Sequence, residues 1–158
     1  MMQGKFGFTV LEAVMVMAVM AAVTITVPAF YYGLRTQGVR LAAGQLRADL
    51  QQARILAINQ RQTCSLEFHS PAANQYTNTL NRRISCLSGY RWEVNFLPSG
   101  PDGRAMGTRI TFNRQGMSAS AVATDLYLAD GQRQSIYRVR VTGPGGIQIH
   151  RWVEGKWR

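Results

Sequence analysis

The chain has 158 residues, a length that suggests one domain with at most one appended segment. Lysine and arginine number 18 against 8 aspartate and glutamate residues, so the formal net charge is +10. This balance favours anionic partners such as nucleic acid, anionic lipid or an acidic protein, although it also simply keeps a protein soluble. A structural zinc site needs about four ligands, but the two cysteines show no CxxC spacing and the two histidines, His69 and His150, are too scattered to suggest one. We therefore expect no metal and no other cofactor.

The N-terminal part of the chain is far more apolar than the rest. A short polar segment with one positive charge, Lys5, precedes an almost uninterrupted apolar run from Phe8 to Val27. About 20 apolar residues suffice to span a bilayer core as a helix, and the apolar region of an ordinary secretory signal is shorter. By the positive-inside rule, Lys5 predicts a cytoplasmic N-terminus and an exported C-terminal part.

One acidic residue, Glu12, lies inside the apolar run. A carboxylate within a membrane helix costs about 2.5–3.5 kcal/mol on insertion scales, so it usually has a partner. The sequence has no lysine or arginine between Phe8 and Phe30. The partner must therefore be a chain terminus, a lipid head group or another subunit.

The segment Gly7-Phe8-Thr9-Val10-Leu11-Glu12 resembles the processing motif of type IV pilins and type II secretion pseudopilins. This resemblance implies that a prepilin peptidase cuts between Gly7 and Phe8 and methylates the new amino terminus of Phe8. It also implies that Glu12 faces the positive amine of a neighbouring subunit in a filament. A plain membrane-anchored binding protein with no filament role is the alternative.

A helical pattern continues beyond the apolar run, with apolar residues at spacings of three and four. One helix from Phe8 to about Asn59 would be roughly 80 Å long, too long for one small domain to bury. We therefore expect a transmembrane half over residues 8–28 and an amphipathic half over residues 29–60. A leader peptide of residues 1–7 precedes them.

From Thr63 onward the apolar pattern changes to a period of two, which predicts strands, and clusters such as Gly143-Pro144-Gly145-Gly146 predict turns. We expect an α+β fold in which the long helix packs on a small antiparallel β-sheet head, residues 61–158. The predicted strands are Thr63–Phe68, Tyr76–Leu80, Tyr90–Phe96, Arg109–Phe112, Ala121–Leu128, Ser135–Val141 and Ile147–Val153.

Two further segments resemble the GspH/FimT branch of the family. Leu46–Ile58 carries its Leu, Gln, Ala-Arg and Ala-Ile signature, and Thr108–Gly116 carries its Ile-Thr-Phe and Gly. The resemblance implies the pilin fold and a structural subunit of a type IV pilus or a type II secretion pseudopilus. The implied partners are other pilin subunits, prepilin peptidase and the bacterial inner membrane, with the head periplasmic or extracellular. The sequence does not give the role of Arg54 within the signature.

Catalytic motifs are missing from the sequence. It has no phosphate-binding loop and no Gly-x-Ser-x-Gly elbow, and no base–nucleophile pair is visible around His69 or His150. We therefore expect no enzyme and no small-molecule substrate.

The two cysteines, Cys64 and Cys86, suggest a single disulfide if the head faces an oxidising compartment. Such a bond would close a loop of about 20 residues and stabilise the head by roughly 3 kcal/mol in the chain-entropy model. Two unpaired, buried cysteines are the alternative.

The C-terminal third of the chain is strongly basic. Arg138 and Arg140 alternate on one predicted strand and therefore share a face. The FimT members of the branch are DNA-binding minor pilins in natural transformation, so the resemblance makes DNA uptake the alternative function. Where those proteins commonly show Gly-Arg-Val/Ile-Arg, this sequence has Gly146-Ile147-Gln148, without either arginine. The other interpretation of the basic residues is a solvated face, or a face matched to an acidic neighbouring subunit. The candidate DNA contacts are Arg138, Arg140, Arg151, Lys156 and Arg158.

Overall fold

The computed structural model describes residues 9–87, 94–120 and 122–158. The chain divides into two units, one ending at Leu34 and the other running from Arg35 to Arg158. All the described residues of the main hydrophobic core belong to the second unit, which we call the head unit.

A single long helix, α1 (Val10–Gln60), opens the described chain, within two residues of the predicted ends. Its first turn is closed by Thr9, whose carbonyl oxygen accepts from the Glu12 N–H at 3.0 Å. Thr9 and Glu12 have the spacing of a capping box, which favours the start of a helix at this point. In the part of the chain that the structure describes, no helix combines the length and the apolar character needed to cross a membrane.

The strands of the head unit form two antiparallel sheets. Sheet A has the strand order β3-β2-β1-β5, and sheet B has the order β4-β6-β7-β8-β9. Their bounds are β1 (Cys64–Phe68), β2 (Gln75–Asn78), β3 (Ile84–Cys86), β4 (Val94–Leu97), β5 (Arg109–Phe112), β6 (Thr124–Asp130), β7 (Ile136–Val141), β8 (Ile147–Val153) and β9 (Lys156–Trp157).

The α+β class is confirmed, but the sequence did not predict two separate sheets or the strands β3 and β9. Both of these strands have at most three residues, too few to show a period of two. Strand β6 ends at Asp130, two residues beyond its predicted end. The prediction missed this end because β6 is buried at nearly every position and so shows no alternation of buried and exposed residues. The residues 90–93 of the predicted strand Tyr90–Phe96 lie outside the described residues.

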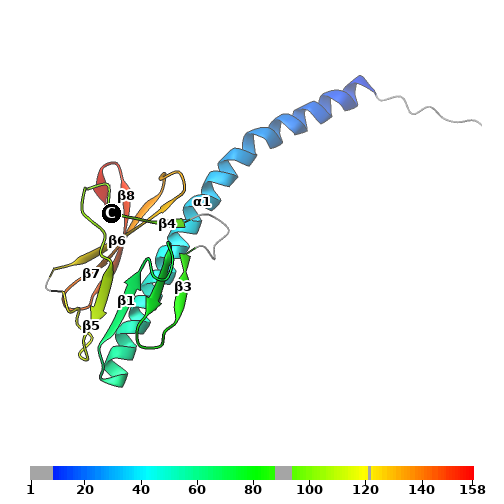
Figure 1. The fold of residues 1–158 in the computed structure, drawn as a ribbon. Helices are drawn as coiled ribbons and strands as arrows, with labels where there is room; N and C mark the ends of the chain where they lie inside the picture. Colours follow the sequence, from blue (N-terminus) through cyan, green and yellow to red (C-terminus); the bar gives the residue numbers. More distant parts are fainter. Residues whose placement is uncertain (1–8, 88–93, 121) are drawn as a thin grey trace, which may run out of the picture. The chain divides into compact units, whose positions relative to one another are not determined.

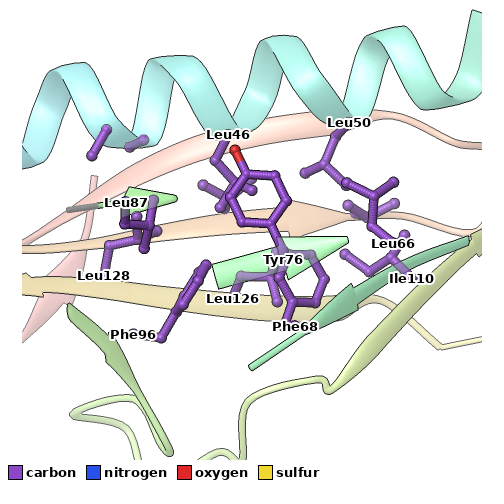
Figure 2. Packing of buried hydrophobic residues seen from close by; sticks show 14 of the residues in the cluster. Leu46, Leu50, Leu66, Phe68, Tyr76, Leu87, Phe96, Ile110, Leu126 and Leu128 are labelled. Carbon is purple, nitrogen blue, oxygen red and sulfur yellow. The ribbon is translucent and has the colours of Figure 1, made fainter. Parts of the chain in front are cut away.

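The core lies between the second half of α1 and the inner faces of both sheets. Figure 1 shows this half of the helix running alongside the strands of the head, and Figure 2 shows Leu46 and Leu50 pointing from the helix into the core. The helix contributes seven buried residues, Val39, Ala42, Ala43, Leu46, Leu50, Ala53 and Ala57. Their spacing of one, three or four residues places them on one helix face, which we call the buried stripe.

Aromatic side chains join the two sheets inside the core. Phe68 and Tyr76 from sheet A lie against Phe96 from sheet B, with ring centroids 5.6 and 6.3 Å from that of Phe96. Asn74 adds a polar link, since its side-chain oxygen accepts from the Phe96 N–H at 2.9 Å. The two sheets therefore share one core instead of forming two separate ones.

The buried stripe generates a stability prediction. Leu46→Ala should lower the free energy of unfolding by about 2–5 kcal/mol, because Leu46 is fully buried and the substitution leaves a cavity. Leu41→Ala, on the opposite side of the same helix with Leu41 58% exposed, should change it by less than about 0.5 kcal/mol. Urea unfolding of both variants measures the difference, and equal losses would contradict the assignment of the buried stripe.

Candidate functional site

The predicted processing site lies at the edge of the described chain. Gly7 and Phe8 are outside the described residues, so their cleavage stays a prediction. Glu12 lies in the first turn of α1 with an exposed side chain. An acidic side chain in the first turn also faces the positive end of the helix dipole.

The first part of α1 exposes apolar side chains on all sides. Consecutive positions 14–17 are all exposed, and each step along a helix turns by about 100°, so no side of this segment is covered by the residues that the structure describes. The exposed large apolar residues are Val10, Leu11, Val14, Met15, Val16, Met17, Val19, Met20 and Val23. A helix that is apolar all round is typical of a segment buried in a protein core or a membrane.

The outer face of sheet B carries a group of charged and aromatic side chains, which we call the Asp125 cluster. The register pairs Asp125 with Arg140 and Tyr127 with Arg138, so all four side chains share one face, as the alternation along β7 predicts. The cluster consists of Asp102, Arg104, Asp125, Tyr127, Arg138, Arg140 and Trp157.

The arginines of the cluster are paired within the chain. The Nε and Nη2 atoms of Arg140 donate to the two carboxylate oxygens of Asp125, each at 2.7 Å, a bidentate pair. This hydrogen bond is the main reason that the pKa of Arg140 is raised. Arg138 is only 5% exposed, and burial lowers its pKa. Its Nη1 atom lies 3.9 Å from Asp102 and its guanidinium carbon lies 4.4 Å from the ring centroid of Trp157.

Tyr127 and Trp157 close the cluster. Burial, followed by the charges of Asp125 and Asp102, raises the pKa of Tyr127 to about 12, so its hydroxyl keeps its proton and donates toward both carboxylates at 3.4 Å. Trp157 donates from Nε1 to the Asp102 carboxylate at 3.1 Å and covers the Arg138 guanidinium. This arrangement ties strand β9 to the turn that contains Asp102, while the buried Nε atom of Arg138 has no hydrogen-bond partner among the described residues.

The other three predicted DNA contacts lie on the opposite side of sheet B. Arg151 pairs with Tyr137 and belongs to the face that carries the core residues, and its backbone exchanges hydrogen bonds of 2.7 and 2.9 Å with Arg158. Lys156 lies two residues from Arg158 and therefore on the same face. Arg151, Lys156 and Arg158 are all exposed, and Arg158 also lies 3.7 Å from Glu154. The five predicted residues thus form two groups on opposite faces.

The two cysteines lie far apart in sheet A. Cys64 belongs to β1 and Cys86 to β3, with β2 between them. The registers pair Leu66 with Asn78 and Gln75 with Cys86, so the two cysteines are also about five residues apart along the sheet. Neighbouring strands are about 4.8 Å apart and residues about 3.3 Å apart along a strand, whereas a disulfide needs Cα atoms within about 7 Å.

The predicted Cys64–Cys86 disulfide is consequently not formed in this structure. The Cys64 thiol is buried and donates to the side-chain oxygen of Asn78 at 3.2 Å. Burial raises the pKa of this thiol, which keeps it protonated. The alternative of a buried thiol therefore describes Cys64, while Cys86 is exposed.

The structure gives Arg54 a role that the sequence analysis did not find. From α1, its Nη1 atom donates to the Gly145 carbonyl oxygen at 2.9 Å, at the turn between β7 and β8. Gly145 has a positive φ of 82°, and a Cβ there would lie 2.2 Å from the Gly116 carbonyl oxygen and 3.1 Å from Arg54 Nε. Only glycine fits this contact, so Arg54 anchors the β7–β8 turn to the helix. In the sequence, the Ala-Arg pair of the signature and the glycine-rich turn were the features from which this contact could have been predicted.

The helix, the two antiparallel sheets and the core they share define a pilin-like head. Residues 42–145, about two thirds of the chain, match the family model described as type II transport protein GspH. The chain belongs to this family.

Two solved structures are similar, both of the type IV minor pilin FimU from Pseudomonas aeruginosa. One has a TM-score of 0.55 and 17% identity, covering 76% of this chain and 92% of that one. The other has a TM-score of 0.52 and 17% identity, covering 75% and 96%. At this identity the likeness concerns the fold. A search of curated proteins found no match.

The Asp125 cluster generates a second prediction. Asp125→Asn should lower the free energy of unfolding by about 3–5 kcal/mol, because it leaves Arg138 buried with a weaker partner and removes the bidentate acceptor of Arg140. The control is Glu67→Gln, which weakens the exposed pair between Glu67 and Arg109 and should cost less than about 1 kcal/mol. Thermal and urea unfolding measure both.

Replacing Arg138 and Arg140 by methionine in the Asp125→Asn background should restore part of the lost stability, because it removes the charges left without a partner. If Asp125→Asn costs no more than Glu67→Gln, the cluster is not a structural ion-pair network.

Proposed function

We propose that the chain is a minor pilin-like or pseudopilin-like subunit of a type IV pilus or a type II secretion pseudopilus. The family match over residues 42–145, together with a head of the minor-pilin fold, is the observation that carries this proposal. Its role is mechanical, with other pilin-type subunits as partners. The outer face of sheet B supports a structural role, because the Arg140–Asp125 pair and the Trp157–Asp102 hydrogen bond hold its strands and the Asp102 turn together.

The N-terminal segment provides anchoring and assembly in this proposal. Prepilin peptidase removes residues 1–7 and methylates Phe8, and residues 8–28 hold the subunit in the bacterial inner membrane, with the N-terminus cytoplasmic and the head periplasmic or extracellular. Support comes from the apolar side chains that α1 exposes on all sides between Val10 and Val23. In this proposal, lipid or the helices of other subunits remove this apolar surface from water.

Glu12 guides docking of the subunit into the filament. A carboxylate among apolar side chains is stabilised strongly by an opposite charge, because the surrounding dielectric constant is low. The methylated amine of a neighbouring Phe8 supplies such a charge. Glu12 is exposed and therefore accessible to a neighbouring chain.

This proposal is tested on the full chain in cells that assemble the filament. Glu12→Gln should leave membrane insertion unchanged and reduce incorporation into filaments at least tenfold, since the neutral amide cannot pair with the amine. Glu154→Gln, which changes an exposed acid in the head, should incorporate normally. Mass spectrometry of the N-terminus should find methylated Phe8 as the first residue. An intact Met1, or normal incorporation of Glu12→Gln, would favour a plain membrane-anchored protein.

A second candidate function is the capture of DNA. It is favoured by the three exposed cations Arg151, Lys156 and Arg158, which share one face at the end of β8 and β9. Arg138 and Arg140 are poor candidates for phosphate contacts, because Asp125 already binds the Arg140 guanidinium and Arg138 is buried. A phosphate would have to compete with carboxylates that are already in place.

The DNA candidate is tested by salt titration of duplex binding by the head unit, residues 35–158. If DNA is captured, a triple variant with Arg151→Ala, Lys156→Ala and Arg158→Ala should bind more weakly. The slope of log K against log salt concentration should become less steep by about one unit for each lost phosphate contact. The matched control removes three exposed arginines elsewhere, Arg109, Arg114 and Arg133. Equal losses in both variants would indicate attraction by net charge alone, and no binding at low salt would end the DNA hypothesis.

A further inference from the structure

A groove lies in the head unit between α1 and the β2–β3 hairpin. Its volume is about 320 Å³, at the lower end of the range for ligand sites. Gln45 and Asp49 line it from the helix, Tyr76 lines it from β2, and residues 83–86 line it from the hairpin and β3. The groove is separate from the Asp125 cluster and from the end of β8 and β9.

One wall of the groove presents a fixed acceptor. The Tyr76 hydroxyl donates to Oδ2 of Asp49 at 2.6 Å, and the Gln45 amide donates to Oδ1 at 3.2 Å. Figure 2 shows the Tyr76 hydroxyl pointing toward α1. Each carboxylate oxygen can accept a second hydrogen bond, so Asp49 keeps capacity for a donor from a ligand.

The opposite wall presents donors without partners. Arg83 is exposed, and its guanidinium makes no hydrogen bond or ion pair with any other residue that the structure describes. The same holds, within the described chain, for the hydroxyl of Ser85, which also lines the groove. An unpaired guanidinium at the mouth of a groove favours a carboxylate ligand, since it can form a charge-assisted hydrogen bond.

The backbone beside the groove is an open strand edge. The Asn78 N–H donates to the Arg83 carbonyl oxygen and the Leu87 N–H donates to the Asn74 carbonyl oxygen, which fixes the hydrogen-bond alternation between β2 and β3. In that alternation the N–H and C=O groups of Ile84 point away from β2. β3 is an edge of sheet A, and the side chain of Ile84 is 56% exposed. Such an edge can accept an added strand.

We propose that this groove receives an extended acidic segment of a second pilin-type subunit. The segment adds a strand to β3 through the backbone of Ile84, places a carboxylate on Arg83 and donates to Asp49. A net charge of +10 makes an acidic partner the complementary one. The identity of the partner as a pilin-type subunit rests on the proposed function, whereas the chemistry of the groove does not.

The test uses the full chain in detergent micelles, labelled with ¹⁵N, and a synthetic extended peptide, acetyl-Thr-Val-Glu-Val-Thr-amide. The proposal expects saturable shifts at the amides of Ile84 and Ser85, with affinity at least fivefold lower when glutamine replaces the central glutamate. Arg83→Glu should abolish binding of this peptide and favour its lysine analogue. Arg83→Gln, which keeps the size and removes the charge, should weaken binding and serves as a second variant if Arg83→Glu perturbs the fold.

The matched control is Arg82→Glu, because Arg82 is an exposed neighbour that does not line the groove. This variant should bind the glutamate peptide within about twofold of the unsubstituted chain. Equal losses in Arg82→Glu and Arg83→Glu, no shifts at millimolar peptide, or saturation by succinate without a shift at Ile84 would each overturn the proposal. Peptide binding requires no filament, so a failure of this test is independent of the Glu12 experiment. Conversely, normal incorporation of Glu12→Gln would overturn the proposed function without affecting the chemistry of the groove.

Discussion

The fold of the head depends on burial of one face of α1 by two sheets at once. Each large apolar side chain of the buried stripe contributes about 1.5–3 kcal/mol when it leaves water. Four of the seven stripe residues are alanines, which let the helix approach the strands closely. Because sheet A and sheet B pack on the same stripe, they share the main core, and a shift of the helix would disturb both.

Two polar residues of α1 hold the sheets in place beside this stripe. Asp49 and Arg54 are buried less than the stripe and lie on either side of it, since each residue advances by about 100° around the helix. Asp49 binds the Tyr76 hydroxyl of sheet A, and Arg54 binds the Gly145 carbonyl oxygen at a turn of sheet B. Apolar burial alone is non-directional, so these two hydrogen bonds supply the orientation that it lacks.

The sequence predicted those parts of the structure that depend on periodicity. The α+β class, the ends of α1 and the positions of β1, β5, β7 and β8 all follow from periods of 3.6 and two. Very short strands such as β9 have no period to detect, and the partition into two sheets depends on pairing between distant segments. The cysteines illustrate the same limit, because their separation is determined by the strand order and not by their spacing in the chain.

The candidate site shows why counting charges has limited power. Arg138 and Arg140 share a face as their alternation predicts, yet the sequence does not reveal that Asp125 and Asp102 lie against them. Asp102 stands in a turn more than 20 positions before Tyr127, Arg138 and Trp157, and only the tertiary fold can bring it close to them. The pattern of the arginines was read correctly, and their partners were missed.

The distribution of pairing matters more for recognition than the total of +10. Where a cation is paired inside the chain, as Arg140 is, a ligand must displace a carboxylate before it gains anything, and a partly buried bidentate pair makes that costly. Where a cation is exposed and has no such partner among the described residues, as is true of Arg83, a ligand carboxylate gains a partner and displaces only water. The outer face of sheet B is therefore a structural surface despite its arginines. The edge of sheet A at β3 instead combines a charge and backbone groups that have no partner in the described part of the chain. For the proposed function of joining other subunits, the second kind of surface is the one suited to recognition.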